Sequence, residues 1–139
     1  MKLNNYYYIF SLIVISQLFT SCASTPVGQG TITSPYEIAL TAGATTGSVG
    51  TTSSYYKITG VTAGITYTVT ITNIDAGEDV DLFVYDDSSF LDQLCSSSNG
   101  YDSPNDPEGC NAVPSGSNLY VEVYNSSNSD GAFFDIDAN

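Results

Sequence analysis

The chain of 139 residues contains no histidine and no arginine, and its only basic residues are Lys2 and Lys57. Without histidine, neither a Ser-His-Asp nor a Cys-His catalytic arrangement can be assembled. The fifteen acidic residues give a formal net charge of -13 at pH 7. Such a chain repels phosphate backbones and lacks the cations that release counterions on binding nucleic acid. Nucleic acid is therefore excluded as a partner.

The acidity has three possible uses. It can attract divalent cations, attract cationic partners, or keep the protein soluble in a salty medium. It does not indicate disorder, because disordered chains are poor in aromatic residues and this one has 11 Tyr and 6 Phe. A chain of this length has room for one domain.

The N-terminus has the features of an export signal. Lys2 precedes an apolar run from Tyr6 to Phe19 that is too short for a transmembrane span. The run ends in Leu-Phe-Thr-Ser-Cys, which resembles a bacterial lipobox and implies cleavage before Cys22 and diacylglyceryl modification of that cysteine. Phe19 departs from the leucine most common at its place. An ordinary signal peptide with an incidental cysteine is the alternative.

This interpretation divides the chain into a signal peptide (1–21), a flexible tether (22–34) and a domain (35–139). The tether is small, polar and contains Gly and Pro. No Asp occupies the second place after Cys22, so the lipobox resemblance implies the outer membrane or cell surface of a bacterium rather than the inner membrane. The lipid anchor is the only expected membrane contact.

Cysteine is scarce beyond the signal, where only Cys95 and Cys110 remain. An even pair in an exported chain favours a disulfide. Metal ligation is the alternative, but two thiols without a histidine or further cysteines cannot complete a typical zinc site. Closing a loop of about 16 residues would contribute roughly 3 kcal/mol to stability.

The domain shows a period of two and no helical periodicity. Residues 65–72 set apolar side chains against threonines, which is typical of a strand with one buried face. Six segments of this kind predict strands: 36–40, 55–59, 65–72, 79–85, 119–124 and 132–137. Their predicted core residues are Tyr56, Ile58, Val80, Leu82, Val84, Leu119, Val121, Val123, Phe134 and Ile136. Six to eight short strands predict an all-β fold, a small antiparallel β-sandwich.

Two connections are predicted from turn residues. Residues 73–78 are rich in Asp and Gly, and they predict a hairpin between the strands on either side. Residues 86–117 predict a long loop that the disulfide closes.

Four segments form an ordered pattern: Ser54–Ile58 followed by Val61–Gly64, then 65–71, then Asp-Val-Asp-Leu-Phe-Val-Tyr at 79–85, and last 116–124. This pattern resembles the bacterial pre-peptidase C-terminal domain family, whose signature is Asp-x-Asp-Leu-Tyr-Val-Tyr. The resemblance covers roughly residues 36–138. It implies a β-sandwich of jelly-roll type with a disulfide loop at Cys95 and Cys110. Members are appended to secreted proteases and are related to collagen-binding modules.

The sequence departs from the family pattern in two ways. No peptidase domain precedes the module, so its role beside an enzyme is not implied here. Glu122 stands where the late strand often has Lys or Arg, which makes this face more acidic.

The acids around the signature strand predict a calcium site. Asp75, Glu78, Asp79 and Asp81 supply local oxygen ligands of the kind that calcium prefers, although the spacing is not that of an EF-hand loop. The alternative is that Asp81 hydrogen-bonds a neighbouring loop and the others are solvated. A weaker second cluster lies inside the disulfide loop, at Asp102, Asn105, Asp106 and Glu108.

The expected function is non-catalytic. Asp79 and Asp81 share one strand face about 7 Å apart, which does not give the opposed carboxylates of a glycosidase. Tyr120, Tyr124 and Phe133 are predicted outward and could form a contact platform for a protein or glycan, unless a loop covers them. The sequence thus predicts a lipid-anchored interaction module outside the cell membrane. The alternative is an accessory or substrate-binding module for a separately encoded secreted protease or other hydrolase.

Overall fold

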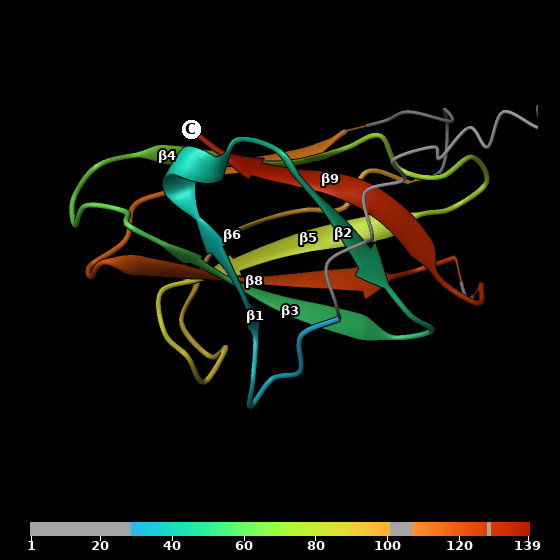
Figure 1. Cartoon of the computed structure of the whole chain (residues 1–139), viewed down its shortest axis with the longest axis horizontal. Coiled ribbons are helices and arrows are strands. Elements are labelled where there is room, and N and C mark those ends of the chain that lie inside the picture. Colours follow the sequence, from blue (N-terminus) through green and yellow to red (C-terminus); the bar gives the residue numbers. More distant parts are fainter. Residues whose placement is uncertain (1–28, 101–106, 128) are drawn as a thin grey trace, which may run out of the picture.

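Figure 1 shows the computed structural model of the protein, which describes residues 29–100, 107–127 and 129–139. Over these residues the chain forms two packed sheets, which confirms the all-β prediction. The described residues form nine strands, more than the predicted six to eight. The elements are β1 (Tyr36–Ala39), the 3₁₀ turn η1 (Leu40–Ala42), β2 (Thr45–Val49), β3 (Ser53–Thr59), β4 (Tyr67–Thr72), β5 (Val80–Tyr85), β6 (Gln93–Ser97), β7 (Glu108–Ala112), β8 (Asn118–Asn125) and β9 (Ala132–Ala138).

The order of the strands is that of a jelly roll. The five-stranded sheet runs β1-β3-β8-β5-β6 and the four-stranded sheet runs β2-β9-β4-β7. The pairs β5–β6, β4–β7, β3–β8 and β2–β9 arise when a long antiparallel ribbon folds about its central turn, which builds a double-sheet jelly roll. β1 is an addition to this pattern, because it pairs with β3 in parallel.

The predicted inward residues form the core. The alternating side chains of β3, β5, β8 and β9 are almost completely buried, as the period of two requires. Every predicted core residue has an exposure of 1% or less. The predicted strand at 65–72 starts later than expected, because Ile65 is 52% exposed and β4 begins at Tyr67.

Three strands were not predicted, and each lacks apolar alternation. β6 and β7 lie within the predicted long loop, and β2 reads Thr-Thr-Gly-Ser-Val. In β2 the inward positions include Gly47 and the core residue Val49. At Gly47 an added Cβ would lie 2.5 Å from the ring of Phe134 and 2.9 Å from the hydroxyl of Tyr56. These two large rings fill the space that an apolar side chain on β2 would otherwise occupy.

The predicted hairpin at residues 73–78 is wrong. β4 belongs to the four-stranded sheet and β5 to the five-stranded sheet, so the connection crosses from one layer to the other. Alternation shows that each strand has one buried face, but it does not show which sheet the strand joins.

Tyr56 links the two sheets at the edge strand β2. Its ring is fully buried, and its hydroxyl donates to the carbonyl of Ser48 at 2.7 Å and accepts the N–H of the same residue at 3.0 Å. Burial raises the pKa of Tyr56 to about 12. The hydroxyl therefore occupies backbone groups that an edge strand otherwise leaves open for pairing.

The ordered contacts begin before the predicted domain boundary at residue 35. Gly30 is buried, and its carbonyl accepts the N–H of Tyr55 at 3.2 Å. A Cβ at Gly30 would lie 1.9 Å from the carbonyl oxygen of Tyr55, so only glycine fits there. Gly30 thus packs on the domain, whereas residues 1–28, with the signal, Cys22 and most of the predicted tether, lie outside the described residues. Among the described residues, no helix has the length and apolar character needed to cross a membrane.

Candidate functional site

The outer face of the five-stranded sheet carries most of the outward aromatic side chains. The strands β3, β8 and β5 bury every second residue, so the intervening residues point away from the core. Cross-strand register places Tyr55 opposite Glu122, Glu122 opposite Phe83, and Asp81 opposite Tyr124. We call this surface the aromatic face: Tyr55, Asp81, Phe83, Tyr85, Tyr120, Glu122 and Tyr124.

Phe90, from the loop between β5 and β6, covers one end of the aromatic face. Its ring centroid lies 4.9 Å from that of Tyr55, 5.4 Å from that of Tyr85 and 5.8 Å from that of Tyr120, in edge-to-face geometry each time. The side chain is 8% exposed, and its backbone adopts a φ of 56°, which a bulky residue rarely takes. Packing of the ring against three tyrosines supports this conformation.

Asp87 holds the loop that carries Phe90. Its carboxylate accepts the N–H groups of Ser89 at 2.8 Å and Asp92 at 3.2 Å, together with the Ser89 hydroxyl at 2.7 Å. These bonds lower the pKa of Asp87, with the Ser89 hydroxyl as the main cause. The covered end of the aromatic face is therefore built from local hydrogen bonds as well as ring packing.

The other end of the aromatic face is open. A shallow hollow of about 350 Å³ lies over β5, β6 and β8, and its lining is Asp81, Phe83, Tyr85, Gln93, Glu122 and Tyr124. This volume falls at the lower end of the range for ligand sites, about 300–1,000 Å³. We call it the acidic hollow, because its two charged side chains are both carboxylates.

Glu122 is fixed by three hydroxyl donors. One carboxylate oxygen accepts from Ser53 at 2.7 Å and from Tyr55 at 3.3 Å, and the other accepts from Tyr85 at 3.1 Å. Desolvation and the charge of Glu122 raise the pKa of Tyr55, and they raise that of Tyr85 to about 12. Both phenols therefore stay protonated at neutral pH and donate to the carboxylate.

Asp81 lies on the same face without such a set of donors. It is half-buried, and none of the hydrogen bonds found within the described residues involves its carboxylate. Desolvation, followed by the charge of Asp79, raises the pKa of Asp81. The side chain is thus a partly desolvated acid at the rim of an open hollow.

The four residues of the predicted calcium site have different surroundings in the structure. Asp75 accepts the N–H of Phe133 at 2.9 Å, Glu78 accepts the hydroxyls of Ser127 and Ser129, and Asp81 faces the acidic hollow. Asp79 contributes its backbone carbonyl, which accepts the N–H of Ser126 and that of Ser127. In the described ranges, no three acidic or other ligating side chains are grouped as a metal site. The residues as arranged do not fit the predicted ion.

Glu78 makes hydrogen bonds within the protein. Its carboxylate binds the hydroxyl of Ser127 at 2.7 Å and also the hydroxyl of Ser129, both from the β8–β9 turn. These two hydroxyls lower the pKa of Glu78, Ser129 being the larger cause. The charged form of this side chain therefore ties the β4–β5 connection to the β8–β9 turn.

The predicted binding residues do not form one platform. Tyr124 is 40% exposed and lines the acidic hollow, whereas Tyr120 lies under the ring of Phe90. Phe133 is 49% exposed, but it belongs to β9 and so lies on the outer face of the opposite sheet. The alternative considered for Tyr120, cover by a loop, is therefore the correct one.

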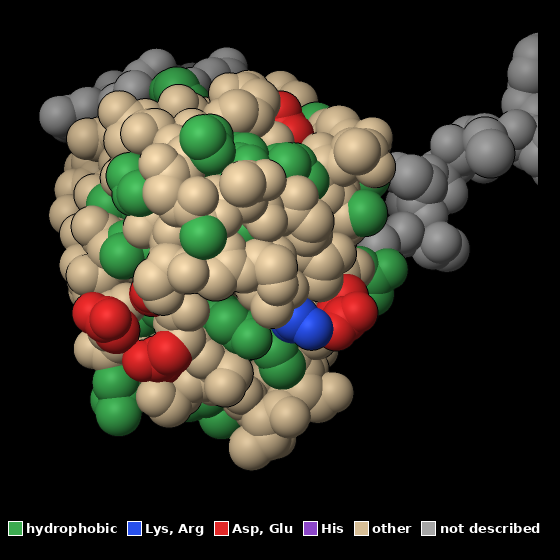
Figure 2. Space-filling model, turned by 90° about the vertical axis from the view of Figure 1, so that its left-hand side faces the viewer, with side chains coloured by type: hydrophobic (Ala, Val, Ile, Leu, Met, Phe, Trp, Pro, Cys, Tyr) green, Lys and Arg blue, Asp and Glu red, His purple; other side chains and the backbone are tan. Residues whose placement is uncertain are grey.

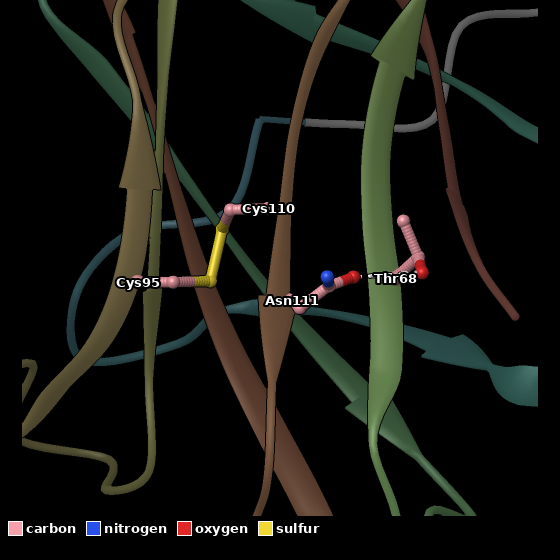
Figure 3. The surroundings of a disulfide bond; sticks show 4 residues. All are labelled: Thr68, Cys95, Cys110 and Asn111. Atoms are coloured by element: carbon pink, nitrogen blue, oxygen red, sulfur yellow. Dashed lines mark hydrogen bonds between the residues drawn. A yellow bond between two sulfur atoms is a disulfide. The ribbon is translucent and has the colours of Figure 1, made fainter.

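The predicted disulfide is present. Cys95 on β6 and Cys110 on β7 have Cα atoms 5.9 Å apart, and they join the edge strands of the two sheets (Figure 3). The next residue, Asn111, accepts the hydroxyl hydrogen of Thr68 at 2.9 Å and so ties β7 to β4. One open side of the sandwich is thus closed covalently.

Glu108, from the second predicted acidic cluster, is buried rather than solvated. It is 1% exposed, and one of its oxygens accepts the N–H of Asn99 at 3.0 Å. Its other oxygen makes no hydrogen bond to the described residues, and the Ser97 hydroxyl opposes the effect of burial on this carboxylate only in part. Desolvation raises the pKa of Glu108. The other members of that cluster, Asp102, Asn105 and Asp106, lie outside the described residues.

Sequence reasoning missed part of the hollow. Phe83 and Tyr85 follow Asp81 at a period of two, and Glu122 lies between Tyr120 and Tyr124 in the same way. That spacing was enough to place each set on one face of its own strand. It was not enough to show that β5 and β8 are neighbours, because they are far apart in the chain.

Comparisons with known proteins agree with this architecture. No family model and no curated protein matches the chain. Among solved structures, it is similar to the pre-peptidase C-terminal domain of the collagenase from Bacillus anthracis, with a TM-score of 0.53 and 15% sequence identity over 76% of this chain and 94% of that one. The described domain therefore has the fold of a pre-peptidase C-terminal domain.

Proposed function

We propose that the protein is a non-catalytic binding module, held outside the cell membrane by a lipid on Cys22, and that the open part of the aromatic face contacts its ligand. The observation that carries the proposal is the acidic hollow, in which aromatic and carboxylate side chains from β5 and β8 meet and the ring of Tyr124 is exposed. Exposed aromatic side chains beside polar groups are a common feature of binding surfaces.

A non-catalytic role follows from the chemistry available. The whole chain has no histidine, and Lys57 is occupied by an ion pair with Glu37 at 2.6 Å. Asp81 and Glu122 lie side by side on one sheet face rather than on opposite sides of a cleft, which a glycosidase needs. Screens on glycoside and peptide substrates are expected to be negative. Turnover that disappears in Asp81→Asn would contradict this part of the proposal.

The binding face is tested with two aromatic variants that match each other. Tyr124→Ala removes an exposed ring from the acidic hollow, and Phe133→Ala removes one of similar exposure from the opposite sheet. Proteins and glycans captured from envelope extracts by the chain starting at Ala23 are compared for both variants. The proposal expects Tyr124→Ala to capture at least about tenfold less of a specific ligand, the loss typical of a hot-spot residue. Phe133→Ala should capture as much of that ligand as the native chain does. Equal capture by both variants would show that the face is wrongly chosen.

The lipid anchor and location are tested separately. A fatty-acid label should enter the native chain and not Cys22→Ala, and the labelled protein should fractionate with the outer membrane or be reachable at the cell surface. Label in both proteins would refute lipidation at this cysteine. Release of an unlabelled mature protein would instead favour an ordinary signal peptide.

A second candidate function is an accessory or substrate-binding module for a separately encoded secreted protease or other hydrolase. It is favoured by the likeness to a domain that belongs to a collagenase. Identification of the captured ligand separates the two candidates, since a hydrolase favours the accessory role and a host or matrix component favours adhesion.

Calcium stabilisation stays a prediction with its own test. Binding at Asp75, Glu78, Asp79 and Asp81 would need Asp75 and Glu78 to leave their present partners and the four side chains to converge. A ligand that binds the folded state at 100 times its Kd adds about 2.7 kcal/mol. A melting temperature that is equal in millimolar calcium and in EDTA would end the calcium hypothesis.

A further inference from the structure

The acidic hollow is lined by negative charges and by no positive charge. Asp81 pairs with Tyr124 across β5 and β8, and Glu122 pairs with Phe83, so the two carboxylates are diagonal neighbours on one sheet face. Diagonal positions lie about 7–8 Å apart at the backbone. No basic side chain lines the hollow. Its negative charge is therefore not balanced from within the described residues.

The single basic residue of the described part cannot supply that balance. Lys57 lies on β3 opposite Tyr120, and its amine is bound to Glu37 of β1 at 2.6 Å. On the face shown in Figure 2, the one basic group likewise touches an acidic group, and other acidic groups lie apart from it. A positive charge for the hollow must come from another molecule.

The carboxylates of Asp81 and Glu122 differ in how they could bind a cation. Glu122 is held in place by hydroxyl donors from Ser53, Tyr55 and Tyr85, so its position costs little to fix on binding. Asp81 is half-buried and has no hydrogen-bond donor from the described residues. A cation beside Asp81 would recover the interactions that partial burial removes.

The remaining lining suits an organic cation. Phe83, Tyr85 and Tyr124 line the hollow together with the carboxylates, and Tyr124 is exposed enough to pack on a ligand. An ammonium or guanidinium group over an aromatic face gains about 0.5–2 kcal/mol. The methylene stem of a lysine or arginine side chain would cover the apolar parts of the same rings.

Other ligand classes fit less well. An anion would be repelled by both carboxylates, and a metal ion would find no group of three ligating side chains within the described ranges. A neutral glycan could stack on the rings and donate to the acids, but it would leave their charge unbalanced. The net charge of -13 favours association with a basic partner over a neutral one.

We propose that the acidic hollow binds a lysine or arginine side chain of a basic protein partner, with Asp81 and Glu122 contacting the cation and Tyr124 packing against it. This inference rests on the proposed function, because it names the chemistry of the ligand at the same face.

The experiment uses the chain that begins at Ala23, which keeps every residue that the structure describes. Peptides of six lysines and of six arginines are titrated at 150 mM salt by calorimetry, and amide shifts are followed by NMR. Asp81→Asn is compared with Asp137→Asn, which removes the same charge from β9 on the opposite sheet. Tyr124→Ala tests the ring, and thermal melting checks that each variant is folded.

The proposal expects a single site with shifts at Asp81, Phe83 and Tyr124. Affinity should fall about tenfold in Asp81→Asn, about threefold to tenfold in Tyr124→Ala, and less than twofold in Asp137→Asn. Equal losses in the two Asp variants would show diffuse attraction to an acidic surface, and would refute the site.

Two further outcomes would overturn the proposed cation site but would leave the proposed binding face intact. If a neutral glucan hexasaccharide shifts the residues of the hollow and the basic peptides do not, the ligand is a glycan. If Tyr124→Ala lowers capture from envelope extracts while Asp81→Asn leaves it unchanged, the binding face stands and the cationic assignment is wrong. If neither variant changes capture, both proposals fail.

Discussion

Removal of the disulfide should lower stability by an amount that follows from its place in the chain. Cys95 and Cys110 are 15 residues apart in sequence. In the chain-entropy account, a loop of this size contributes about 3 kcal/mol by restricting the unfolded state. For a domain of roughly this size, 1 kcal/mol corresponds to about 4 °C in melting temperature. The expected decrease is therefore about 12 °C.

The native state gives a second reason to expect a large effect. β6 and β7 are edge strands of different sheets, so no backbone ladder joins them. The disulfide is the covalent link between these two edges (Figure 3). Without it, β6 retains its ladder to β5 and β7 retains its ladder to β4, and the fold should survive with lower stability.

The assay is thermal unfolding by circular dichroism of the chain that begins at Ala23, so that Cys22 does not interfere. Oxidised protein, reduced protein and the double variant Cys95→Ser/Cys110→Ser are compared, and reductant added to the double variant is the control. The reduced protein and the variant should melt at similar temperatures. A decrease below about 3 °C in both would refute the account, because the loop would then not restrict the unfolded chain.

Four further predictions concern single side chains. Phe90→Ala should lower the free energy of unfolding in urea by about 2–4 kcal/mol, because a buried ring and its aromatic pairs are lost. Leu91→Ala changes a neighbour that is 83% exposed, so it should change this free energy by less than about 0.5 kcal/mol. Equal effects of the two variants would contradict the packing role of Phe90. Tyr56→Phe should cost about 1–3 kcal/mol, because two backbone groups of β2 lose their partner, and an unchanged midpoint would refute the link between sheets. Because the pKa of Glu78 is lowered, its charged carboxylate stabilises the fold above the unfolded pKa, and this stabilisation is lost as pH falls through the folded pKa. The melting temperature of Glu78→Gln should therefore fall less between about pH 5 and 3 than that of the native protein. The raised pKa of Glu108 has the opposite effect, because its charge lowers stability as pH rises above the unfolded pKa. Glu108→Gln should raise stability at pH 7 by about 1 kcal/mol and have little effect at pH 3.5. A loss of stability at pH 7 would show that the carboxylate has a favourable partner.

Much of the core could be predicted from the sequence because burial leaves a local signature. In β5, the order Val-Asp-Leu-Phe-Val puts every second side chain inside, and the structure agrees. The edge strands left no such signature. β2 has only Val49 as a large apolar core residue and Gly47 two places before it, and β6 contributes polar and half-buried residues, so both segments resemble loops in sequence.

The candidate site was predicted only in part, for a related reason. Asp81 and Tyr124 were each singled out from their own strand, but as members of different sites. They meet because β5 and β8 are hydrogen-bonded neighbours, a pairing between segments about 40 residues apart. Phe133 was grouped with Tyr124 because both were predicted to point outward from the last two strands, and the two lie on opposite sheets.

The sequence by itself determined the class of the fold, the buried face of each well-patterned strand, the single disulfide and the absence of histidine chemistry. These depend on side-chain periodicity and composition, which are local properties. Tertiary structure alone decided which strands are neighbours, that Phe90 closes one end of the aromatic face, and that Asp75 and Glu78 bind different partners within the protein. Those outcomes depend on how the ribbon folds over itself, since that folding sets the distance between residues that no local pattern connects.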